Sequence, residues 1–87
     1  MSLPPPVPSA RAAADRVESV VAGTLCLMSC YASDPRRCHA ERIASNLALL
    51  AEDAAVSAPM RTLCRRMSER WDALATLAAD GRRGALH

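Results

Sequence analysis

Cysteine and histidine side chains are the groups in this sequence best suited to metal binding or catalysis. They occur as Cys26-x3-Cys30-x7-Cys38-His39-x24-Cys64. Structural zinc is usually held by two close pairs such as C-x2-C, and that pattern is absent. Cys38 and His39 are neighbours, and a helix turns neighbours about 100° apart, which does not suit a thiol–imidazole catalytic pair. The spacing therefore predicts no metal site and no cofactor.

Other arrangements typical of enzymes are also missing from the sequence. It contains no Ser/His/Asp arrangement, no phosphate-binding loop and no H-E-x-x-H motif. We therefore expect that the protein is not an enzyme.

The four cysteines are not expected to form disulfide bonds. In an antiparallel helical hairpin, Cys38 and Cys64 lie near opposite ends, more than about 10 Å apart. Cys30 and Cys38 lie level, but each points away from the apolar stripe of its own helix. The first eight residues lack the basic and apolar regions of a secretory signal. We expect a cytoplasmic chain with four small, partly buried and reduced thiols.

Polar side chains near the predicted helix–helix contacts form a candidate cluster. His39 borders the apolar stripe of the second predicted helix together with Asn46, and Arg66 and Arg70 come level with them on the third. These four side chains could form a ligand or partner site. In the alternative interpretation, which we favour, they form a solvated edge where arginine stems cover apolar surface and their charges stay in water.

The arginines suggest nucleic-acid binding as an alternative function. The chain has eleven basic residues, all arginine, and a net charge of +2, too small to imply nucleic acid by itself. Six of them could contact phosphates: Arg36, Arg37, Arg42, Arg61, Arg65 and Arg66. Two observations argue against this function. Acidic residues lie between the arginines, and the predicted helices are longer than those of a helix-turn-helix DNA-binding motif. A small nucleic-acid-binding regulator therefore stays the alternative.

The composition, together with the positions of proline, glycine and capping residues, predicts the helices that carry these residues. The chain has 87 residues, 51% of them hydrophobic, only 2% aromatic and only three glycines, which excludes an all-β fold and favours one small helical domain. A proline-rich arm (1–8) precedes helices predicted over about 9–31, 35–56 and 58–79, and a short tail (81–87) follows. Ser9 and Asp34 are the predicted N-caps of the first two helices, Ser57 with Pro59 marks the start of the third, and Gly81 marks its end. The short connections predict an antiparallel three-helix bundle.

Apolar spacing predicts which face of each helix is buried. The first stripe is Val17, Val20, Val21, Thr24, Leu25, Leu27, Met28 and Tyr31. The second is Ala40, Ile43, Ala44, Leu47, Leu50, Ala51 and Ala54, and the third is Met60, Leu63, Met67, Trp71, Leu74, Leu77 and Ala78. No helix has the length of apolar sequence or the basic polar face that a membrane requires.

The first helix carries more apolar and small surface than a three-helix bundle needs. A row of small residues runs along a second side at i, i+4, i+7 and i+11: Ser19, Gly23, Cys26 and Cys30. Small side chains allow two helices to approach closely, so we expect a homodimer through this helix. In the alternative interpretation the proline-rich arm folds back over the row. The interface candidates are Gly23, Cys26, Cys30, Leu27 and Trp71.

These observations predict a small helical structural or protein-interaction module. It would associate with a second copy or bind a helix of a partner protein. The stretch 42–53 is ordinary amphipathic helix and carries no motif specific to a family.

Overall fold

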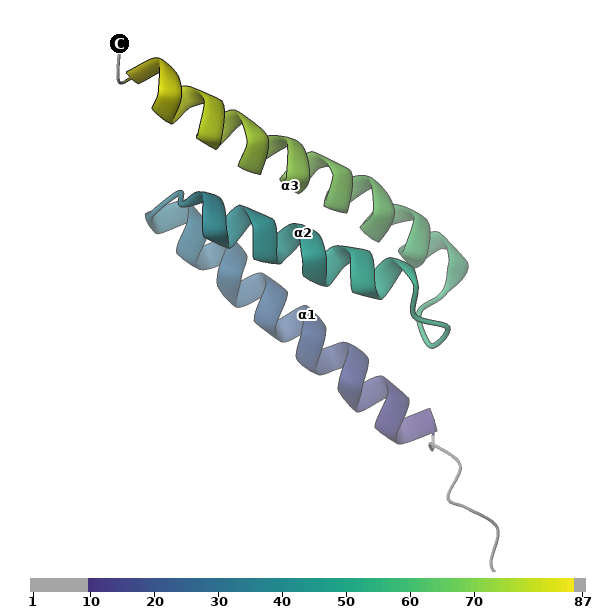
Figure 1. Ribbon diagram of the computed structural model, residues 1–87. Coiled ribbons are helices and arrows are strands. Elements are labelled where there is room, and N and C mark those ends of the chain that lie inside the picture. The colour runs from purple at the N-terminus through teal and green to yellow at the C-terminus, as the bar shows by residue number, and fades with distance from the viewer. Residues whose placement is uncertain (1–9, 86–87) are drawn as a thin grey trace, which may run out of the picture.

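The computed structural model describes the fold of residues 10–85 and the side chains of residues 10–77. Over this range the protein is all-helical, with α1 (Ala10–Ser33), α2 (Arg37–Ala51) and α3 (Ala58–Ala85) and no strand. The chain reverses direction at each connection, so α2 lies between α1 and α3 and runs antiparallel to both (Figure 1). The prediction of three packed helices is confirmed. The predicted arm and the cap at Ser9 lie outside the described residues.

The turn between α1 and α2 differs from its prediction. The Asp34 backbone N–H donates to the Cys30 carbonyl (2.8 Å), which closes the last turn of α1. The Asp34 carboxylate accepts a hydrogen bond from the Arg36 side chain, and Arg36 takes the N-cap position of α2 without a side-chain cap. Asp34 is therefore not the N-cap of α2, because its backbone ends the preceding helix.

The second helix ends at Ala51, earlier than predicted, because Asp53 starts a turn. Its carboxylate accepts a hydrogen bond from the Ala55 N–H (2.9 Å), and its carbonyl accepts one from the Val56 N–H (3.0 Å). An aspartate that binds the backbone two residues on competes with helix continuation. The turn leaves Ala54 exposed, contrary to the prediction, and buries Val56.

The third helix starts as predicted and runs longer. The Met60 N–H donates to the Ser57 hydroxyl (3.4 Å), and the Arg61 N–H donates to the Ser57 carbonyl (2.8 Å). At the other end α3 continues through Gly81 to Ala85, whereas the prediction ended it at residue 79. Glycine prefers a helix end but is tolerated inside a helix at a cost of about 1 kcal/mol relative to alanine.

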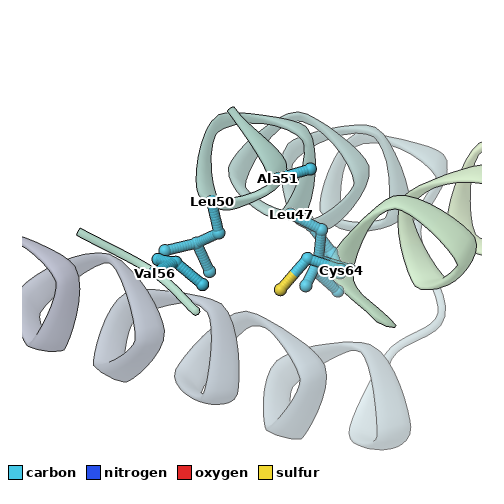
Figure 2. Packing of buried hydrophobic residues seen from close by; sticks show 6 residues of the cluster. Leu47, Leu50, Ala51, Val56 and Cys64 are labelled. Carbon is cyan, nitrogen blue, oxygen red and sulfur yellow. The ribbon is translucent and has the colours of Figure 1, made fainter. Parts of the chain in front are cut away.

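The core is built mainly by α2. Six residues of its predicted stripe are buried: Ala40, Ile43, Ala44, Leu47, Leu50 and Ala51. Val56 and Cys64 complete the cluster, and Figure 2 shows Leu50 beside Val56 and Leu47 beside Cys64, all above α1. Half-buried side chains of α1 and α3 cover this cluster from both sides.

Packing between α2 and α3 is close and uses small side chains. The Ser68 hydroxyl donates a hydrogen bond to the Ala44 carbonyl across the two helices (2.8 Å). The face of α3 that is buried or half-buried contains Cys64, Met67, Ser68, Trp71 and Ala75. The two backbones approach closely at this point, because the short Ser68 side chain reaches the Ala44 carbonyl.

The predicted stripe of α3 is therefore rotated from the face that packs. Four of its members are exposed: Met60, Leu63, Leu74 and Leu77. Only Met67 and Trp71 join the core as predicted, and Ala78 lies beyond the side chains that the structure describes.

Packing of α1 on the core is looser. Thr24 is its single buried residue, and its hydroxyl donates to the Val20 carbonyl (2.7 Å). Five members of the predicted stripe are half-buried: Val17, Val20, Leu27, Met28 and Tyr31. Val21 and Leu25 are exposed, contrary to the prediction, because α2 supports only the middle of the broad apolar arc.

Candidate interaction surfaces

The row of small residues on α1 is open in the single chain. Ser19, Gly23, Cys26 and Cys30 are all exposed. A Cβ atom placed on Gly23 would have no neighbouring heavy atom within 4 Å apart from the helix's own backbone. The α1 seam, as we call these four residues, is therefore not covered by the described part of the chain. The arm that could fold over it lies outside that part.

The other two predicted interface residues belong to the packing of the chain itself. Leu27 is half-buried against the core. The Trp71 ring lies edge-to-face with the Tyr31 ring, with centroids 5.0 Å apart and planes at 83°. This geometry is favourable for aromatic rings and joins the C-terminal part of α1 to α3. Leu27 and Trp71 are therefore only partly available to a partner.

An apolar surface on α3 was missed by sequence reasoning, which assigned it to the core. The α3 stripe consists of exposed Met60, Leu63, Leu74 and Leu77 with half-buried Met67 between them. Arg70 occupies the remaining position of the same heptad spacing. Arg66 and Arg70 line one shallow hollow together with Leu63 and Met67. The apolar spacing of α3 alone did not distinguish this surface from the buried face.

The four residues of the predicted polar cluster are not joined to one another. His39 and Asn46 are half-buried on α2, whereas Arg66 and Arg70 are exposed on α3. The His39 Nδ1 atom lies 3.3 Å from the Asp34 carbonyl. Among the described side chains, no hydrogen bond or ion pair connects any two of the four.

Four of the six arginines considered for phosphate binding lie at the two ends of the α2–α3 pair. Arg36 and Arg37 lie at the start of α2, where they pair with Asp34 and with Glu41 (2.7 Å). Arg61 and Arg65 lie at the start of α3, beside Ala51 and Glu52 at the end of α2. Because the two helices are antiparallel, these pairs are at opposite ends of the molecule (Figure 1).

All four cysteines are free thiols. Cys26, Cys30 and Cys38 are exposed, and Cys64 is buried. Burial raises the pKa of the Cys64 thiol above its ordinary value, because it disfavours the thiolate. Within the described residues, no group of three or more His, Cys, Asp or Glu side chains is arranged to hold a metal ion.

One ion pair joins α1 to the turn after α2. The Arg16 guanidinium lies 3.1 Å from the Asp53 carboxylate, which it contacts with two nitrogens. The pKa of Asp53 is lowered, first by the hydrogen bond from the Ala55 N–H and then by Arg16. Asp53 thus shapes the turn and holds the N-terminal half of α1 against it.

Two findings bear on the class of protein. Within the described residues, none of the helices has an apolar stretch sufficient to span a bilayer. Comparison of the chain with protein-family models, curated proteins and solved structures finds no match.

Proposed function

We propose that the protein is a helical interaction module that associates with a second copy of itself through α1. The observation that carries this proposal is the exposure of α1: only Thr24 of its 24 residues is buried, and all four residues of the α1 seam are exposed. A helix face that its own chain leaves uncovered is available for contact with another helix.

The α1 seam supports close helix–helix packing as the mode of association. A Gly–Cys–Cys face at helical spacing lets two backbones approach, and Gly23 costs its own helix about 1 kcal/mol relative to alanine. Nothing inside the described chain uses the space at Gly23. In close contact with a second α1, the lack of a side chain at Gly23 would let the two helix backbones approach.

Sedimentation equilibrium of two matched variants tests the proposal. Gly23→Met places a large side chain on the seam, and Ala32→Met places the same side chain on exposed surface of α1 away from the seam. We expect association at micromolar concentration in the wild-type chain and in Ala32→Met, and its loss in Gly23→Met. Equal association of the two variants would contradict docking through the seam.

A further inference from the structure

The α3 stripe is a second surface, independent of the α1 seam. Its members and Arg70 repeat at the spacing of a coiled-coil seam, at positions 60, 63, 67, 70, 74 and 77, and Leu77 is 64% exposed. Met67 also packs against the core, whereas Met60, Leu63, Leu74 and Leu77 are exposed.

The charges on this stripe are positive. Arg70 lies in line with the apolar residues and Arg66 lies one turn before it; both are exposed, and neither forms an ion pair within the described residues. Glu69 borders the same hollow, but it lies off the line of the stripe. A helix that docks here therefore brings apolar groups to the leucines and meets two guanidinium groups at the centre.

A second copy of α3 does not suit this surface. In a parallel pair, Arg70 would stack on its own equivalent. In an antiparallel pair centred between residues 67 and 70, the Arg66 and Arg70 side chains of both copies would gather around one point. Like charges that meet in an interface repel one another, so this repulsion disfavours pairing of two copies of α3.

We infer that the α3 stripe docks an amphipathic helix of another protein whose apolar stripe is accompanied by carboxylates. The leucines and methionines would supply the buried contact, and Arg66 and Arg70 would select an acidic partner through ion pairs at its edge. Guanidinium groups suit this role because they bind carboxylates with two parallel hydrogen bonds.

Fluorescence anisotropy with two designed peptides tests the inference on the full chain. Both probes are amphipathic helices with leucines at heptad spacing; one carries glutamates beside the leucines and the other carries lysines in the same places. We expect the acidic probe to bind roughly three- to tenfold more tightly, with a difference that shrinks as salt increases. Equal affinity for the two probes would overturn the inference.

Charge-reversal variants localise the effect. Arg70→Glu removes or reverses the preference, whereas Arg65→Glu, which makes the same charge change on an exposed site off the stripe, keeps it. Identical behaviour of the two variants would contradict docking at the stripe. Circular dichroism confirms that both variants remain helical.

A third variant separates this surface from the proposed self-association. Leu63→Ser removes apolar surface from the stripe, and we expect it to weaken binding of the acidic probe without changing the mass of the chain in solution. Loss of self-association in Leu63→Ser would show that a second copy covers the stripe, and would overturn the inference. Gly23→Met should bind the acidic probe as the wild type does.

Discussion

At the scale of single residues, burial separates one cysteine from the other three. Cys64 lies in the core among α2 side chains, and its raised pKa reduces the fraction of reactive thiolate. Cys26, Cys30 and Cys38 are exposed. The sequence spacing predicted free thiols for all four, but it placed Cys64 outside the stripe of its helix.

We expect thiol labelling to reflect this difference. In the native protein at mildly alkaline pH, Cys26, Cys30 and Cys38 should react rapidly, and Cys64 should react only as fast as the chain unfolds. Peptide mapping by mass spectrometry measures each site. At high protein concentration Cys26 and Cys30 should become slower, while Cys38 serves as the unchanged control. Rapid labelling of Cys64 would contradict the packing of α3 described above.

The Asp53 carboxylate makes stability depend on pH in the acidic range. Its pKa in the folded chain is lower than the ordinary value of 3.8, so its contribution is fully present above 3.8 and is lost as pH falls through the lowered pKa. We expect the unfolding midpoint of the wild type to fall between about pH 5 and pH 2 more steeply than that of Asp53→Asn. The asparagine keeps an acceptor for the Ala55 N–H and lacks the charge. Identical pH profiles would contradict this role for Asp53.

At the scale of helices, the phase of the α3 stripe shows what sequence reasoning can and cannot reach. The apolar period of α2 predicted its buried face, because a helix enclosed by two neighbours buries its largest apolar residues. On α3 four large apolar residues are exposed, whereas Cys64 and Ala75 are buried and Ser68 forms a hydrogen bond to α2. Which face of α3 packs depends on its contact with α2, and the period within one helix does not contain that information.

The connections show a similar limit. Ser57 starts α3 as expected, because capping is a local interaction between neighbouring residues. Asp34 and Asp53 act differently from the prediction. The Asp34 N–H closes the last turn of α1, and the Asp53 carboxylate accepts a hydrogen bond from the Ala55 N–H after the end of α2. The row of small residues on α1 was recognised in the sequence, whereas its exposure, the α3 stripe and the separation of the polar cluster appear only in the folded chain.

Close packing of α2 on α3 makes a small-to-large substitution costly. Ala44→Leu places three more carbons where the Ser68 hydroxyl meets the Ala44 carbonyl, and we expect a loss of about 1–3 kcal/mol in the free energy of unfolding. Ala32→Leu, at an exposed site on α1, is the matched control and should change stability by less than about 0.5 kcal/mol. Urea denaturation measures both. Equal effects would show that α2 and α3 are less closely packed than described.

At the scale of the whole molecule, the chain has one core and two open apolar surfaces. α2 is enclosed between its neighbours, while α1 and α3 each keep one face without a partner among the described residues. A chain of this size buries roughly 60% of its unfolded surface, so its stability is modest, and association would add to it.

Gly23→Ala distinguishes an isolated chain from an associated one by the sign of its effect. The added methyl group meets nothing inside the described chain and improves helix propensity, so it should stabilise the dilute monomer by about 0.5–1 kcal/mol. At high concentration, where two seams are in contact, the same methyl group should weaken association. Thermal unfolding at a series of protein concentrations measures both. Stabilisation by the same amount at every concentration would contradict close packing at Gly23.

The molar mass of the wild-type chain in solution tests the central claim most directly. Sedimentation equilibrium at micromolar concentration should give an average mass that rises from 9.3 kDa towards twice that value as protein is added. A mass that stays at 9.3 kDa throughout, with Cys26 and Cys30 equally reactive at every concentration, would contradict it.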